Sequence, residues 1–366
     1  MSVYRSYFTN AGLLDNTFEF HDSIHRILVP EYKPSKNLVV ICNDDMVCFY
    51  DDATLELLPF NRRRISTEDL LKNTFTKFRN TQFVLFHNVV NLNINCTNCL
   101  QVQLGNNWTN KNLLHYRPVN NKLFGENYHW ITLNNNKRLH RTLSCMYLLG
   151  KHFDGTGYIK VDPSDIEHEP SWNDYLDYWR INERNEIFTV SEKHGIFEKG
   201  FTKLKKGNGY IANTFRTRAE SSNADNFNNE LCLWYKHTAV ELVNEVQWCP
   251  NTSGIISEKY FNTVFGRNIP ILISTQNSLQ MIRQSGYDVF DDVLDNGYDT
   301  IEDPFLRMTS AIDNNSLLFT DQDYAKQVWL ELQPRMQKNI EQVRINENKT
   351  QEELTQIFKS TIESFK

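Results

Sequence analysis

The stretch HWITLNNNKRLHRTLSCMYLLGK, residues 129–151, joins a short apolar run to a helix-like pattern through a polar turn. Residues 129–133 predict a buried strand, and residues 134–138 predict a turn. From residue 139 onward, apolar side chains return mostly at intervals of three and four, which is the spacing of one helix face. A strand, a turn and a helix in this order form the repeating unit of α/β proteins. The stretch therefore predicts an α/β fold.

Similar units recur on both sides of this stretch. Buried strands are predicted at residues 37–42, 82–90, 158–161, 239–248 and 269–273, and helices from residue 66 or 67 and over residues 257–267, 279–285 and 321–366. Residues 162–229 are polar, and seven lysines and arginines fall between residues 193 and 218, which predicts a loop-rich or mobile insertion. We expect an N-terminal domain over 1–125, a C-terminal domain over 126–320 that contains this insertion, and helices over 321–366.

The bulk composition favours a globular intracellular protein. The chain has 366 residues and is 40% hydrophobic, which allows a sizeable core. Its formal charge of −6 argues against nucleic-acid binding over the whole surface. No run of 18 apolar residues and no signal-peptide pattern is present, so we expect no membrane span and a cytoplasmic location. About 40 asparagines suggest an AT-rich genome, as many viral genomes are. For a viral protein, the expected location is the host cytoplasm.

The cysteines indicate neither disulfides nor a metal site. Seven cysteines are scattered along the chain, an odd number that is typical of reduced thiols. Cys96 and Cys99 form a lone CxxC, and a zinc site needs two further converging ligands. We therefore expect no bound metal.

Two helix starts are candidate anion-binding sites. Arg138, His140 and Arg141 lie in or before the first turn of the helix predicted from residue 139. Cations oppose the helix dipole there, and a bound phosphate would offset them. A solvated basic turn explains the same residues equally well.

The second helix start is Ser257-Glu258-Lys259, ahead of a buried strand at 269–273. Ser257 can cap the helix, and Glu258 is favourable in its first turn, so both have a structural explanation. Lys259 is unfavourable at the positive end of a helix unless it neutralises an anion. Units of this kind bind ligands at the carboxyl ends of their strands.

Other motifs carry little weight. The string GNGYIA at 207–212 fits a dinucleotide fingerprint, but no buried strand precedes it. Walker, GxSxG and HExxH motifs are missing from the sequence. Asp44 and Asp45 follow a predicted strand and are candidates for a general base, although most such carboxylates are turn residues.

The two helix starts together resemble the donor-binding half of GT-B glycosyltransferases of the fucosyltransferase-like group. That group carries an Asn followed six residues later by an Arg at a helix start, here Asn135 and Arg141. It also carries a Thr/Ser-Glu-Lys helix start before a Val-Pro-Val-type strand, here Ser257-Glu258-Lys259 and Ile269-Pro-Ile271. Residues 279–299 are similar to uncharacterised phage-encoded relatives. The resemblance covers residues 129–160 and about 240–310.

The resemblance implies two Rossmann-like domains facing a cleft, with the C-terminal domain holding a UDP- or GDP-linked sugar as co-substrate and no resident cofactor. Arg141 and Lys259, with Asn135, Arg138 and Ser257 beside them, would bind the pyrophosphate. Glu258 would take the ribose hydroxyls. It implies an inverting, metal-independent transfer to an acceptor hydroxyl. The acceptor-side signatures of the fucosyltransferases are missing.

The acceptor and the function class stay open at this point. A phage-like source would supply hydroxymethylated DNA bases as acceptors, and the basic run within 193–218 could contact DNA phosphates; a glycan or protein acceptor is the alternative. A solvated loop explains the basic run more simply. Two non-enzymatic alternatives are a nucleic-acid-binding accessory protein and a structural virion protein.

Overall fold

The computed structural model describes residues 2–6, 18–19, 38–43, 76, 82–87, 96–97, 99–103, 113–124, 128–134, 139–160, 171, 173, 193–206, 223–245 and 256–363. The chain divides into two compact units. Unit 1 comprises Met1–Thr109, Asn251–Ser253 and Asn346–Lys366, and unit 2 comprises Asn110–Pro250 and Gly254–Ile345. The sequence had placed a domain boundary near residue 125.

Unit 1 contains a five-stranded sheet of order β2-β1-β3-β4-β5. Its strands are β1 (Ser2–Ser6), β2 (Phe18–Glu19), β3 (Leu38–Asn43), β4 (Gln82–His87) and β5 (Cys99–Gln103). Neighbouring strands are parallel except β2, which is antiparallel to β1. The strands predicted at 37–42 and 82–90 are thereby confirmed. The helix predicted from residue 66 or 67 is outside the described residues, apart from a helical residue at Thr76.

Unit 2 is an α/β unit built on a parallel four-stranded sheet of order β7-β6-β8-β9. The strands are β6 (Trp130–Leu133), β7 (Gly157–Lys160), β8 (Val240–Asn244) and β9 (Ile269–Ile273). All four were predicted from the sequence. Nearly every residue of these strands is buried, as expected for a parallel sheet covered on both faces.

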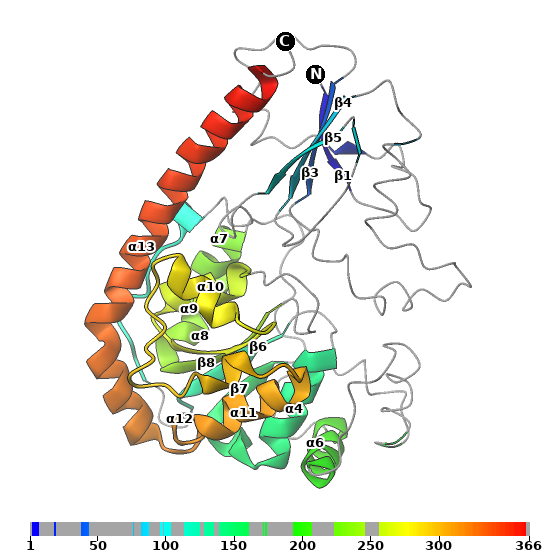
Figure 1. The fold of residues 1–366 in the computed structure, drawn as a ribbon. Helices are drawn as coiled ribbons and strands as arrows, with labels where there is room; N and C mark the ends of the chain where they lie inside the picture. The colour runs from blue at the N-terminus through cyan, green and yellow to red at the C-terminus, as the bar shows by residue number, and fades with distance from the viewer. Residues whose placement is uncertain are drawn as a thin grey trace. The chain divides into compact units, whose positions relative to one another are not determined.

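The strand order creates a switch point between β6 and β8. From β6 the chain passes through α4 (Leu139–Gly150) to β7 on one side, whereas from β8 it passes through α9 (Glu258–Gly266) to β9 on the other side. Because such crossovers are right-handed, the two helices must lie on opposite faces of the sheet. Figure 1 shows α4 and α9 on opposite faces. Crevices at switch points are the ligand-binding places of open α/β sheets.

Helix α4 is buried along its whole length and packs against α6 (His194–Lys205). The sequence had predicted a loop-rich or mobile segment here, and for residues 194–205 that prediction was wrong. Phe197, Phe201 and Leu204 are buried on one face of α6, at spacings of four and three residues that suit a helix. The lysines of this segment led to the prediction of a polar loop, and the apolar stripe was overlooked.

Further helices complete unit 2. They are η3 (Leu113–His115), η4 (Phe153–Thr156), α7 (Asn223–Asn226), the π-helical turn η6 (Phe227–Leu231), α8 (Cys232–His237), α10 (Ser278–Gln284), η7 (Gly297–Thr300), α11 (Pro304–Asn314) and α12 (Leu317–Thr320). Residues 223–229, at the end of the insertion expected at 162–229, are therefore also helical, and the helical segment continues to residue 237, with Phe227 and Tyr235 buried.

The chain's longest helix is α13 (Gln322–Glu363), which confirms the helical C-terminal segment (Figure 1). Its first half packs on unit 2, where Trp329 Nε1 donates to the Arg267 carbonyl at 2.6 Å and Arg335 pairs with Asp288. Within the described part of the chain, no helix is long and apolar enough to cross a membrane.

Candidate functional site

The candidate site lies at the carboxyl ends of β6 and β8. Asn134 follows β6 and Glu245 follows β8 directly. Trp130 pairs with Val240 and Ile131 with Glu241, an offset of 110 residues, and the same offset sets Asn134 level with Asn244. The segments that lead from these strand ends to α4 and α9, residues 135–138 and 246–255, are outside the described residues.

The first turn of α4 is tied to the end of β8. His140 Nε2 donates to the Glu245 carbonyl oxygen at 2.7 Å, and Arg141 Nη2 lies 3.5 Å from the same oxygen. Both side chains are buried, and Arg141 is only 2% exposed. The Arg141 guanidinium is thus held at the switch point, rather than in solvent as a basic surface turn would be.

The first turn of α9 meets the same strand end. Ser257 caps the helix, because its Oγ accepts the Lys259 backbone N–H at 3.3 Å. The Ser257 backbone N–H in turn donates to Glu245 Oε1 at 3.1 Å. Helices α4 and α9, which lie on opposite faces of the sheet, therefore both contact Glu245.

Glu258 and Lys259 form an ion pair of 2.7 Å at the start of α9. Burial alone would raise the pKa of Glu258, but Lys259 and, more weakly, Arg141 bring it below its usual value. Glu258 is therefore the ion-pair partner of Lys259, and the positive charge of Arg141 adds a weaker attraction. The sequence argument had left Lys259 without an anion; in the structure Glu258 supplies that charge.

Glu245 is the site residue that sequence reasoning missed. Its side chain is fully buried, and this burial raises the pKa of its carboxyl group, with Lys259 opposing the shift. In the sequence Glu245 fell inside the strand predicted at residues 239–248, whereas β8 ends at Asn244 in the structure. Nothing local showed that residues 140, 141 and 257 converge on Glu245.

The structure brings together four of the predicted residues, Arg141, Ser257, Glu258 and Lys259. Asn135 and Arg138 lie outside the described residues, as do Asp44 and Asp45, which follow the last residue of β3 in the sequence. Among the described residues, no group of three or more His, Cys, Asp or Glu side chains is arranged to hold a metal ion.

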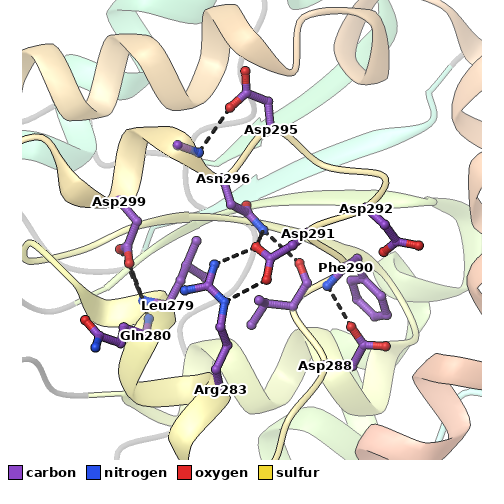
Figure 2. Close-up of polar contacts among 12 residues, drawn as sticks. Leu279, Gln280, Arg283, Asp288, Phe290, Asp291, Asp292, Asp295, Asn296 and Asp299 are labelled. Carbon is purple, nitrogen blue, oxygen red and sulfur yellow. Dashed lines mark hydrogen bonds and ion pairs between the residues drawn. The ribbon is translucent and has the colours of Figure 1, made fainter.

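A separate hollow of about 520 Å³ lies beside α10. Polar side chains line most of it, but their charges have partners within the chain (Figure 2). Arg283 makes a bidentate pair with Asp291, and Asp295 Oδ1 accepts the Gly297 N–H. Asp299 accepts backbone N–H groups from the first turn of α10. These contacts give the charged groups structural roles.

Comparison of the chain with protein-family models, with curated proteins and with solved structures finds no match. The chemistry of the site is therefore inferred from its charged groups. These are two cations, Arg141 and Lys259, and two carboxylates, Glu245 and Glu258. Such a set can hold an anion at the two helix starts and accept hydrogen bonds from hydroxyl or amino groups close by.

Proposed function

We propose that the chain is a nucleotide-sugar-dependent glycosyltransferase with a GT-B architecture similar to the fucosyltransferase-like group, in which unit 2 holds the donor. The observation that carries the proposal is that both cationic helix starts contact Glu245 at the switch point of a parallel sheet. Arg141 Nη2 lies 3.5 Å from the Glu245 carbonyl oxygen, and the N–H of Ser257, two residues before Lys259, donates to Glu245 Oε1. These cations start α4 and α9, helices of 12 and 9 residues, whose dipoles also favour an anion.

Arg141 and Lys259 are the groups that would bind the diphosphate of a UDP- or GDP-linked donor. As the bond between the sugar and the diphosphate breaks, negative charge grows on the leaving diphosphate, and fixed cations stabilise it. The acceptor hydroxyl would lose its proton to a carboxylate base, for which Asp44 and Asp45 are the candidates. Asn135 and Arg138 would complete the phosphate site. The reaction needs no resident cofactor, and attack opposite the leaving group inverts the anomeric carbon.

The proposed acceptor is a hydroxyl group of a hydroxymethylated base in phage DNA or of a glycan. Helix α6 and the C-cap that follows it carry the exposed lysines Lys199, Lys205 and Lys206 for contact with DNA phosphates. Lys193 is less suitable, because it pairs with Asp313 at 2.9 Å. Glycosylation assays with hydroxymethylated and unmodified DNA, read by mass spectrometry, distinguish the acceptors.

A thermal-shift series with UDP, GDP and their sugar conjugates tests donor binding. Ligand at 100 times Kd should stabilise the native protein by about 2.7 kcal/mol. Lys259→Ala should abolish that stabilisation, whereas Lys338→Ala, at an exposed lysine on α13, should keep it. Hydrolysis of the preferred donor then identifies the sugar. If no nucleotide stabilises the protein and DNA binds in a salt-sensitive way, the non-catalytic nucleic-acid-binding alternative replaces the proposal.

A further inference from the structure

Three buried acceptor oxygens at the ends of β6 and β8 have no hydrogen-bond partner among the residues that the structure describes. They are Asn134 Oδ1, Asn244 Oδ1 and Glu245 Oε2. Each belongs to a side chain that is at least 98% buried. Buried polar atoms in native proteins are nearly always paired with protein, water or ligand. The ends of β6 and β8 therefore carry acceptor oxygens for which the described residues supply no hydrogen-bond donor.

The two amides are held with their nitrogens facing into the protein. Asn134 Nδ2 and Asn244 Nδ2 donate to the same hydroxyl oxygen, Thr132 Oγ1, at 3.2 and 3.1 Å. Asn134 Nδ2 also lies 3.5 Å from Cys145 Sγ on α4. Both nitrogens are thus engaged, and the oxygen of each amide has no hydrogen-bond partner among the described residues.

In Glu245, too, only one of the two polar side-chain atoms has a described partner. Its Oε1 accepts the Ser257 backbone N–H, while Oε2 lies buried without a partner in the described chain. The ionised carboxylate needs a donor at Oε2, and the protonated acid needs an acceptor there. In either state the described residues supply a hydrogen-bond partner to only one oxygen of this carboxyl group.

Glu258, the other carboxylate of the site, is already occupied. Its Oε1 accepts from Lys259 Nζ at 2.7 Å, and Arg141 adds to the attraction. A diphosphate bound by Arg141 and Lys259 would compete with Glu258 for these same cations. Glu258 is thus better described as the counter-ion of the unliganded site than as a free acceptor.

We infer that Glu245 accepts a hydrogen bond from a ribose hydroxyl of the bound nucleotide, with Oε2 as the accepting atom. This inference rests on the proposed function and replaces Glu258 in the ribose role that the resemblance implied. A carboxylate after a strand of a nucleotide-binding sheet is well suited to a ribose hydroxyl. Glu245 sits at the switch point between the two helix starts that carry Arg141 and Lys259, the cations proposed to bind the phosphates of that nucleotide.

The test compares ribonucleotides with their 2′-deoxy and 3′-deoxy analogues by isothermal titration calorimetry on the full chain. The wild-type protein should bind UDP or GDP about tenfold more tightly than at least one deoxy analogue, because a hydrogen bond to a charged group is lost. Glu245→Gln keeps the Ser257 contact but places a donor or a weaker acceptor at the second position. It should therefore lose the preference for the ribonucleotide.

Two matched variants locate the effect. Glu241→Gln changes another buried glutamate on β8, at the amino end of the strand, and should keep the ribose preference. Glu258→Gln should also keep it. If Glu245→Gln fails to fold, Glu245→Asp, which shortens the side chain and keeps its charge, should reduce the preference.

The outcomes separate the two proposals. Equal binding of ribo- and deoxynucleotides by the wild-type protein, or a preference that survives in Glu245→Gln, overturns the assignment and leaves the proposed function standing. Loss of the preference in Glu258→Gln alone returns the role to Glu258. If the wild-type protein binds no nucleotide, both proposals fall, and the unpaired oxygens are satisfied by buried water.

Discussion

Gly200 on α6 lies so close to Met146 on α4 that a Cβ at residue 200 would come within 1.8 Å of the Met146 carbonyl oxygen. Gly150 repeats this relationship at the other end of the contact, where a Cβ would lie 2.0 Å from the Ile196 carbonyl oxygen. Two glycines, one from each helix, therefore allow the backbones of α4 and α6 to meet. Since Arg141 is in the first turn of α4, this packing also fixes one wall of the candidate site.

Gly200→Ala should destabilise unit 2. The added methyl group meets backbone, which cannot rotate away, so α4 and α6 must separate; overpacking of this kind costs about 1–3 kcal/mol. Gly195→Ala on the same helix is the matched control, because a Cβ there meets nothing within 4 Å and alanine favours helix by up to about 1 kcal/mol. Urea unfolding measures both. An equal effect of the two substitutions would contradict the close contact.

Glu241 should make the stability of unit 2 depend on pH. Burial raises its pKa to about 8, although Thr263 and Tyr235 donate hydrogen bonds to it. Between about pH 4.5 and 8 the carboxyl is then protonated in the folded state and ionised in the unfolded state. Folding takes up a proton in this window, so stability should fall as the pH rises, by up to about 1.4 kcal/mol per pH unit.

Glu241→Gln should remove this dependence. The difference in unfolding free energy between the variant and the wild-type protein should grow in favour of the variant from pH 5 to pH 8 and level off above pH 8. Glu331→Gln, at an exposed position on α13, controls for the change in net charge and should follow the wild-type curve. A constant difference between Glu241→Gln and wild type across this range would show that Glu241 is ionised in the folded protein throughout.

The sequence predicted the four strands of unit 2 and the helices α4, α9 and α10, because their signals are local. Ile269–Ile273 is a short apolar run flanked by polar residues, and Ser257 is a standard capping residue. Helix α6 was not predicted because its lysines were interpreted as part of a basic run, and the stripe of Phe197, Phe201 and Leu204 was not recognised.

The site was only half predictable for a different reason. Arg141 and Lys259 could be identified because each lies at a predicted helix start. That both helix starts contact Glu245 depends on the strand order of the sheet. Glu245 contacts His140 and Arg141 across more than 100 residues of sequence, and no local pattern encodes such a contact. The expectation that Lys259 lacks an anion was wrong, because Glu258 was assigned to the helix start alone and not to an ion pair with Lys259.

Asp299→Ala should destabilise the region around α10. Both carboxylate oxygens of Asp299 accept the Leu279 N–H, at 3.1 and 3.0 Å, and one accepts the Gln280 N–H at 3.3 Å (Figure 2). Removal leaves buried donors unsatisfied, at about 1–3 kcal/mol. Asp295→Ala, at an exposed residue of the same hollow, should change stability by less than half as much. Similar losses for both variants would argue that Asp299 is not the helix cap.

Replacement of Arg335 on α13 by lysine should reduce stability modestly. Its Nε and Nη2 donate to the two carboxylate oxygens of Asp288 at 2.5 and 2.8 Å, and Nη1 donates to Asp292 at 2.9 Å. A lysine cannot reproduce this fork. Because the group is partly exposed, we expect Arg335→Lys to cost only about 1 kcal/mol, and less at high salt. Thermal unfolding should show no comparable loss for Arg344→Lys, an exposed site on the same helix.

Arg141→Gln tests whether the buried cation serves a ligand or only the fold. Glutamine keeps an N–H donor near the Glu245 carbonyl oxygen but removes the charge. If Arg141 binds phosphate, the variant should lose about tenfold in affinity for a nucleoside diphosphate and little for the corresponding nucleoside, since only the diphosphate carries the anion. Calorimetry on the folded variant separates this effect from any loss of stability, which is expected because the side chain is 2% exposed. Equal affinity of Arg141→Gln and wild type for the diphosphate would make Arg141 a structural link between α4 and β8.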